Sequence, residues 1–186
     1  MEAVFIAAAL VFVAELGDKS QLMAMTFATR YRARTVILGM GIACALINLA
    51  SALVGEALGQ FIPQDVLRIV AGIVFLVFAA ITAWSLRGGE DDEELTVVPH
   101  SGRALLAVGL AFAVAELGDK TMFATMTLAT QYPWFWVWIG STAGMLVSIT
   151  LAVVLGKQVL KVVPIRAVHA VAAMLFAALG IWMLLG

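Results

Sequence analysis

The chain has 186 residues, of which 63% are hydrophobic and 12% are charged, and its mean hydropathy is +1.06. A soluble domain typically carries about 25% charged residues, so this composition indicates lipid-facing surface rather than a large core. The net charge of −1, without a basic cluster interleaved with aromatic residues, disfavours nucleic acid as a partner. The single cysteine, Cys44, excludes a disulfide framework within the chain.

Six apolar segments follow one another along the chain, each long enough to span about 30 Å of hydrocarbon. They cover residues 3–29, 35–61, 66–86, 104–130, 134–160 and 165–185. Glu2 precedes the first segment, and no basic region stands before it, so we expect this segment to stay in the membrane rather than to be cleaved as a signal peptide. The sequence therefore predicts an all-α membrane protein with six transmembrane helices.

One polar stretch, "RGGEDDEELTVVPHSGR", separates the third apolar segment from the fourth. Its glycine pair, its acidic run and Pro99 are typical of a solvated linker, which we place at residues 87–102. The linker divides the chain into two halves, residues 1–86 and 103–186.

The two halves repeat one another. A shift of 101 positions brings "AELGDKSQLMAMTFATRY", which starts at Ala14, onto "AELGDKTMFATMTLATQY", which starts at Ala115. The same shift, without a gap, superimposes Gly39 on Gly140, Gly55 on Gly156 and Pro63 on Pro164. Each half contains an odd number of spans, so the second half must enter the membrane from the opposite side. This pattern predicts an inverted-topology repeat.

Loop charges give an independent prediction of the topology. Connections 1–2, 3–4 and 5–6 lie on one side of the membrane, and the other side carries only Arg68. The basic residues of the first side are Arg30, Arg32, Arg34, Arg87, Arg103, Lys157, Lys161 and Arg166. Because basic loops stay in the cytoplasm, we expect that side to be cytoplasmic and both termini to lie outside the cytoplasm.

The repeated motif places charges near the midpoints of the first and fourth spans. These charges are Glu15, Asp18, Lys19, Glu116, Asp119 and Lys120. One charged residue at a helix centre costs roughly 2.5–3.5 kcal/mol, so six uncompensated groups would cost on the order of 15–20 kcal/mol. The charged groups must therefore meet one another, water or a ligand.

Spacing suggests how they meet. In a continuous helix, residues three and four apart lie on one side, so Glu15, Asp18 and Lys19 are expected on one helix face. Packing of the two halves about a twofold axis would bring both acidic faces to the centre. Gly17, like its equivalent in the second half, permits a kink or a close helix approach. The Gly140-x-x-x-Gly144 spacing, and its equivalent in the first half, favours tight helix packing.

Four carboxylates and two ammonium groups sum to −2, which one divalent cation or two protons would neutralise. Carboxylates favour a hard cation, and no histidine or cysteine accompanies the motifs to favour zinc or copper. Further oxygen ligands are available from Ser20, Gln21 and Thr121. Met25 and Met126 are candidates for a soft ligand or for packing. We expect the metal to bind the ionised carboxylates and protonation to displace it.

Several alternatives remain open at this point. The charged residues of the motifs could form salt bridges within each helix without binding a ligand. The two lysines could either tune the carboxylates or only balance their charge. Asn48 and Ser148, polar and within the second and fifth spans, are candidates to complete the site or to link helices. The acidic centre also suits the ammonium group of an amino acid or amine. An intramembrane enzyme is disfavoured, because the spans contain no arginine or histidine near the midplane. They also contain neither an HExxH nor a GxSxG motif.

The pair "ELGDKS" and "ELGDKT" resembles the duplicated Glu-x-Gly-Asp-Lys/Arg-Ser/Thr signature of the Gdt-type cation transporters, uncharacterised protein family 0016. The resemblance covers essentially the whole chain. It implies manganese/calcium–proton antiport, as in the Golgi members, or manganese export, as in the bacterial members. It also implies that Glu15, Asp18, Glu116 and Asp119 bind the cation and that Lys19, Ser20, Lys120 and Thr121 complete the motifs.

The sequence and the resemblance together predict a secondary transporter, not an enzyme, that exports Mn²⁺ from the cytoplasm in exchange for protons. Calcium is the nearest alternative substrate, and an amino-acid or amine exporter is the more distant one. Mn²⁺ or Ca²⁺ is expected as transported substrate, with no cofactor. The expected location is the inner (cytoplasmic) membrane.

Overall fold

The computed structural model describes residues 2–85, 104–162 and 165–185, and every regular element within these ranges is an α-helix. The predicted linker, residues 87–102, lies outside the described residues. The helices are α1 (Glu2–Glu15), α2 (Lys19–Arg30), α3 (Ala33–Phe61), α4 (Gln64–Ser85), α5 (Ala104–Glu116), α6 (Lys120–Ala129), α7 (Trp134–Val162) and α8 (Ile165–Leu185). The predicted all-helical class is confirmed.

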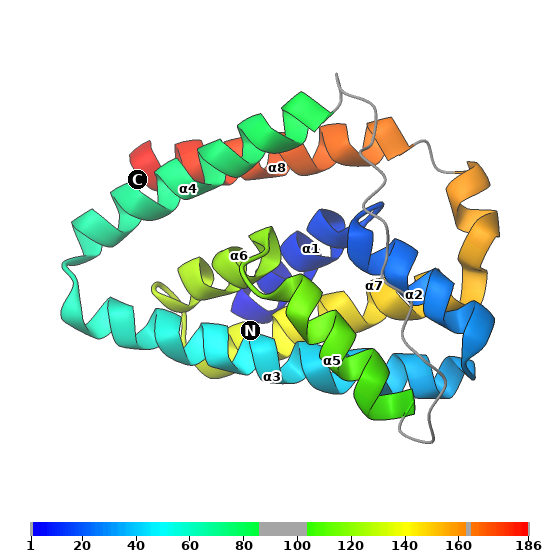
Figure 1. Ribbon diagram of the computed structural model, residues 1–186. Coiled ribbons are helices and arrows are strands. Elements are labelled where there is room, and N and C mark those ends of the chain that lie inside the picture. The colour runs from blue at the N-terminus through cyan, green and yellow to red at the C-terminus, as the bar shows by residue number, and fades with distance from the viewer. Residues whose placement is uncertain (1, 86–103, 163–164, 186) are drawn as a thin grey trace.

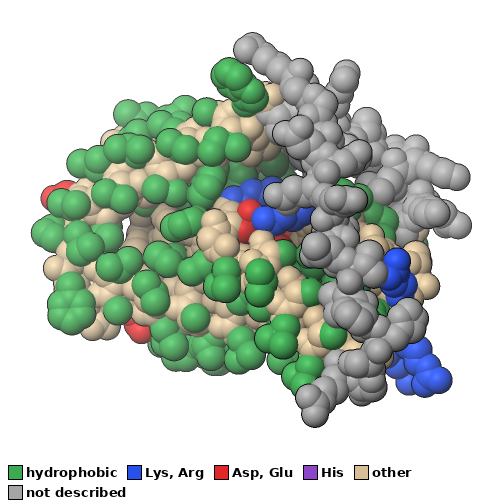
Figure 2. Space-filling view, in the orientation of Figure 1, with side chains coloured by type: hydrophobic (Ala, Val, Ile, Leu, Met, Phe, Trp, Pro, Cys, Tyr) green, Lys and Arg blue, Asp and Glu red, His purple; other side chains and the backbone are tan. Residues whose placement is uncertain are grey.

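The surface and the helix lengths are those of a membrane protein. Among the described residues, three helices are long and apolar enough to cross a membrane: Ala33–Phe61, Asp65–Trp84 and Trp134–Leu155. Two shorter apolar helices cover Ala104–Glu116 and Ala170–Leu185. Large apolar side chains are exposed along these helices, as Figure 2 shows by the green side chains spread over the visible face. Exposed apolar area of this extent is stable in lipid and not in water.

The prediction of continuous helices over residues 3–29 and 104–130 is wrong. Each segment contains two helices, because the chain leaves the helical conformation at Gly17 and at Gly118. Their φ angles are 75° and 81°, in the left-handed region that glycine adopts without the Cβ clash of other residues. α1 and α5, before the breaks, are strongly apolar, whereas α2 and α6, after them, are more polar. The six-span prediction treated each segment as one apolar span and did not use this difference.

The helices pack in pairs that correspond between the two halves of the sequence. α1 and α2 contact α7, and their equivalents α5 and α6 contact α3. α3 also contacts α7, and α4 contacts α8. The two members of each of these last pairs run in opposite directions (Figure 1). The α3–α4 and α6–α7 connections lie at one end of the molecule, whereas α2 joins α3 at the opposite end (Figure 1).

Small residues allow the closest helix contacts. A Cβ atom placed on Gly140 of α7 would lie 2.9 Å from Ala7 Cβ and would clash with the backbone carbonyl of Val4 in α1. The equivalent Gly39 of α3 makes the corresponding contact with α5, somewhat less tightly, with 2.9 Å from such a Cβ to the carbonyl oxygen of Leu105. The shift of 101 positions converts one contact into the other. The predicted role of these glycines in tight packing is confirmed.

α4 and α8 form a separate pair beside the other helices (Figure 1). Phe75 and its repeat equivalent Phe176 stack at the crossing, with ring centroids 6.0 Å apart. Phe78 connects this pair to α6 through Phe123, at a centroid distance of 6.2 Å. The remaining six helices therefore surround the two helix breaks, where the charged motifs lie.

Replacement of Gly140 by alanine is expected to destabilise the protein by about 1–3 kcal/mol, since backbone in α1 must move to make room. Gly41→Ala is the matched control in the other long helix, because there the new methyl meets only the end of the Leu146 side chain. Thermal unfolding in detergent measures both. Equal melting temperatures of the two variants would contradict the proposed close contact of α1 with α7.

Candidate metal site

The two helix breaks hold the charged residues of the motifs. Glu15 and Glu116 are the last residues of α1 and α5, and Asp18 and Asp119 occupy the N-cap positions of α2 and α6. The prediction that Glu15, Asp18 and Lys19 share one face of a continuous helix is therefore wrong. The turn at each glycine, rather than helical spacing, decides where these side chains point.

Three carboxylates from the two halves meet at the breaks. One ligand oxygen each from Glu15, Asp18 and Asp119 lies within 4.8 Å of the others. Two oxygens on opposite sides of one ion are separated by at most twice the metal–oxygen bond, about 4.6–5.2 Å for Ca²⁺ at 2.3–2.6 Å. The three oxygens therefore already lie at the separation that one divalent cation spans.

Glu116, the fourth predicted carboxylate, lies beside these three. Its side chain is 2% exposed and accepts a hydrogen bond from the Thr121 hydroxyl at 3.4 Å. Glu15 is 1% exposed and accepts the equivalent hydrogen bond from Ser20. Both glutamates are thus held by the hydroxyl that ends the motif of their own half.

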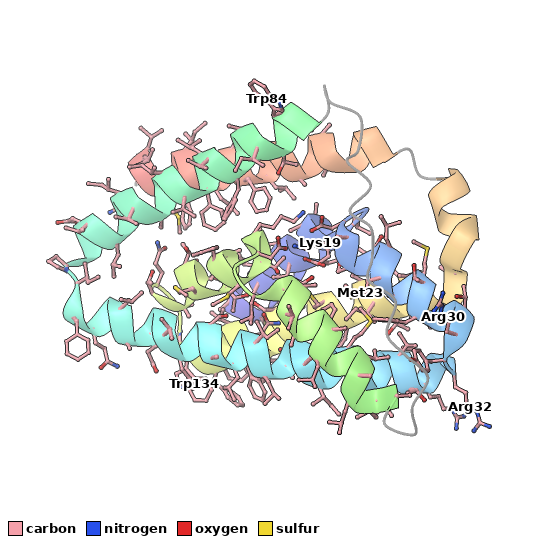
Figure 3. The ribbon with its side chains drawn as sticks, in the orientation of Figure 1. Lys19, Met23, Arg30, Arg32, Trp84 and Trp134 are labelled. Atoms are coloured by element: carbon pink, nitrogen blue, oxygen red, sulfur yellow. The ribbon has the colours of Figure 1, made fainter. Side chains whose placement is uncertain are left out.

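The lysines pair across the two halves. Lys120 Nζ lies 2.8 Å from Asp18 Oδ2, and Lys19 Nζ lies 3.6 Å from Asp119 Oδ1. Figure 3 places Lys19 at the start of α2, in the middle of the molecule, whereas Arg30 and Arg32 lie at the far end of that helix. In the space-filling view, acidic and basic side chains gather at one place within a green and tan face (Figure 2). The expected compensation of charge by charge is present, and it joins residues about 100 positions apart.

Some carboxylate oxygens lack a donor. Glu15 Oε1, Glu116 Oε1 and Asp119 Oδ2 are buried without a hydrogen-bond partner within the described part of the chain. Buried polar atoms are nearly always paired, and unpaired ones require an explanation such as an ion or water. A cation at the centre of the site would satisfy oxygens of this kind.

Gln21 stabilises the first break. Its side-chain oxygen accepts a hydrogen bond from the Gly17 amide at 2.9 Å, and its amide nitrogen donates to Ser148 of α7 at 2.8 Å. In the second half, Met122 takes the equivalent position, with its sulfur 3.4 Å from the Gly118 amide. The sequence pattern predicted Gln21 as a residue that supplies an oxygen ligand to the metal, but it gave no sign of a role for Met122.

Met25, one of the two methionines considered as soft ligands, packs against a hydrophobic cluster.

The arrangement suits a hard divalent cation. The candidate ligand atoms at the breaks within the described part of the chain are carboxylate, hydroxyl and amide oxygens, apart from the Met122 sulfur. The four carboxylates and two lysines carry a formal charge of −2, which matches one divalent cation. Each half contributes residues, so a movement of one half relative to the other would open or close the site.

Comparison with known proteins points to the same chemistry. The family described as "Divalent cation/proton antiporter GDT1" matches residues 3–90 and 104–186. A Vibrio cholerae protein named "Putative manganese exporter" is 34% identical over 89% of this chain and 82% of its own length. A GDT1-like protein of Synechocystis is 29% identical over 90% of this chain and 89% of its own length.

A more distant relative is a yeast protein from Saccharomyces cerevisiae, named "Divalent cation/proton antiporter GDT1". It is 23% identical over 88% of this chain and 76% of its own length. No solved structure matches the chain.

The ion pair between Lys120 and Asp18 is testable by a double-mutant cycle with Lys120→Met and Asp18→Asn. We expect each single variant to be destabilised by about 1–3 kcal/mol, because it leaves a partly buried charge without its nearest partner, and the double variant by less than the sum. Thermal unfolding in detergent gives the coupling. The longer Lys19–Asp119 pair is the internal comparison and should couple more weakly. Additive effects at both pairs would show that the two halves do not meet here.

Proposed function

Because this chain belongs to the divalent cation/proton antiporter GDT1 family, we propose that it is a secondary transporter that exports Mn²⁺ from the cytoplasm in exchange for protons. The observation that carries this proposal is the group of three carboxylate oxygens, contributed by both halves, within 4.8 Å of one another. The name of the Vibrio cholerae relative supports manganese as the cation.

In this proposal the cation binds Glu15, Asp18, Glu116 and Asp119. Lys19 and Lys120 hold the aspartates of the opposite half, and Ser20 and Thr121 hold the glutamates. Gln21 supports the first break through its two hydrogen bonds. Oxygen ligands of this kind bind Mn²⁺ and Ca²⁺ alike, so Ca²⁺–proton exchange is the second candidate. Oxygens within 4.8 Å of one another are close enough to share one Ca²⁺ ion as well.

An exporter of amines receives less support. The site already contains two ammonium groups, those of Lys19 and Lys120, each beside an aspartate. A substrate amine would have to displace one of them from its partner. A divalent cation instead balances the charge that remains after the lysines are counted.

The membrane arrangement that we propose has six spans, two of them broken, in two inverted halves of residues 1–86 and 103–186. The opposite directions of α3 and α7, and of α4 and α8, support it (Figure 1). Arg30, Arg32 and Arg34 mark one end as cytoplasmic, and both termini then lie outside the cytoplasm, in the inner membrane of a bacterium. Broken helices near the membrane midplane are typical of ion sites in secondary transporters.

Exchange follows from the charge of the site. One Mn²⁺ or two protons neutralise the net charge of −2, and a neutral site crosses the membrane core at lower cost than a charged one. Mn²⁺ from the cytoplasm binds the ionised carboxylates, and the loaded halves rock to expose the site outside. Protons then displace the metal and return with the site.

Neutralisation of a single carboxylate tests the site. Glu15→Gln and Asp119→Asn are each expected to reduce Mn²⁺ transport in proteoliposomes to the level of empty liposomes, because each removes a charged ligand without a change of shape. Glu56→Gln, a carboxylate of α3 outside the motifs, is the matched control and should transport normally. Undiminished transport by either motif variant would remove the site from the proposal.

Proton coupling has its own test. With Mn²⁺ added outside proteoliposomes, each entering ion should drive protons out, so a pH-sensitive dye in the lumen should report alkalinisation. The Glu15→Gln variant should give no signal. Mn²⁺ entry with an unchanged lumenal pH would instead indicate a channel or a uniporter.

A further inference from the structure

A group of neutral polar side chains lies buried where α3, α6 and α7 meet. Thr125 Oγ1 lies 3.0 Å from Ser141 Oγ and 3.5 Å from Asn48 Oδ1. Thr125 and Ser141 are fully buried, and Asn48 is 3% exposed. We call these three residues the outer polar cluster. None of them belongs to the charged motifs.

The cluster adjoins the acidic site on one side. Thr125 lies one turn after Thr121 on the same side of α6, and the Thr121 hydroxyl donates to Glu116 at 3.4 Å. On the other side, Asn48 Nδ2 donates to Cys44 Sγ at 3.3 Å. Thr125 lies in α6, seven residues after the break at Gly118, and Ser141 lies about 10 Å, or two turns, from the start of α7. Both positions are on the way from the acidic site to the α6–α7 connection. In the proposed topology this is the outer side.

The first half of the chain contains no polar equivalent. The shift of 101 positions places Ala24 against Thr125, Met40 against Ser141 and Ile149 against Asn48. All three counterparts are buried, and they belong to one hydrophobic cluster where α2, α3 and α7 meet. The same junction is thus packed with apolar side chains at the other end of the molecule. Helix packing at this junction therefore does not require the polar groups.

The oxygens of the cluster can accept a further partner. Thr125 Oγ1, Ser141 Oγ and Asn48 Oδ1 are linked to one another by hydrogen bonds. Each hydroxyl or amide oxygen has two lone pairs, so these contacts leave acceptor capacity on the three oxygens. Amide and hydroxyl oxygens are ligands of hard cations, and they bind more weakly than carboxylates because they are neutral.

We propose that the outer polar cluster is a transit site for the divalent cation, occupied after the cation leaves the carboxylates and before it reaches the outside. This inference rests on the proposed export function and adds a second position on the exit route. A weak site next to a strong one lowers the barrier to release, since the cation exchanges ligands stepwise. The apolar counterpart at the cytoplasmic end offers the cation no such position.

The first test compares two threonines. Thr125→Val keeps the shape and removes the hydroxyl, and we expect Mn²⁺ transport in proteoliposomes to slow about fivefold, the loss of one neutral ligand. Equilibrium Mn²⁺ binding in detergent should stay within about twofold, because the carboxylates are intact. Thr142→Val, next to Ser141 but outside the cluster, should transport at the wild-type rate.

The outcomes separate the transit site from the function itself. Wild-type transport by Thr125→Val, measured alongside an inactive Glu15→Gln, would overturn the transit site and leave the proposed function standing. If Thr125→Val has a lower melting temperature but an unchanged transport rate, the cluster only links helices, and the proposal of a transit site is overturned as well.

The second test uses the single cysteine. In a Cys44→Ser background, which keeps an acceptor for Asn48, Ser141→Cys should react with a membrane-impermeant thiol reagent added from outside. Mn²⁺ should slow this reaction at least about fivefold, as expected for a shared position. Met40→Cys, the repeat counterpart, should not react from outside. Labelling of Ser141→Cys only from the cytoplasmic side, or from neither side, would contradict the proposal.

Discussion

The structure depends on how six charged side chains are tolerated in the middle of an apolar protein. Each ammonium group lies beside an aspartate of the other half, so neither half can neutralise its own motif by these contacts. The two glutamates are held by hydroxyl groups of their own halves. What remains is a buried charge of −2 with unpaired oxygens, which is stable only when a cation or protons complete it. The packing of the two halves thus also brings together the carboxylates that we propose as cation ligands.

The glycine turns make this arrangement possible. In a continuous helix, every backbone N–H group at the centre would be bonded within the helix, and no helix N-terminus would lie beside the carboxylates. A positive φ at Gly17 and Gly118 ends one helix and starts the next, so that each aspartate occupies an N-cap position. Helix N-termini carry partial positive charge, which favours nearby carboxylates. The backbone of α2 and α6 therefore assists the lysines in holding negative charge where lipid would otherwise exclude it.

Symmetry of the backbone does not extend to every side chain. The glycine contacts of α7 with α1 and of α3 with α5 are equivalent, as are the two cross-half ion pairs. By contrast, Gln21 corresponds to Met122, and the outer polar cluster corresponds to apolar residues. An exporter needs different chemistry on its two sides, because it must bind on one side and release on the other. The departures from the repeat are where such differences can be introduced without loss of the shared packing.

The sequence by itself determined the helical membrane class, the duplication and the identity of the charged residues, because hydropathy, repeated letters and charge are local properties. It also indicated the helix contacts at Gly39 and Gly140. It predicted one span through each motif and allowed a kink at Gly17 and Gly118, but it did not establish that each span is two helices, since hydropathy does not report the φ angle of a glycine. Only the tertiary structure decided that Glu15, Asp18 and Asp119 converge while Glu116 lies beside them, and that each lysine pairs with the opposite half. Those contacts join residues about 100 positions apart, and they depend on the packing of whole helices rather than on any local pattern.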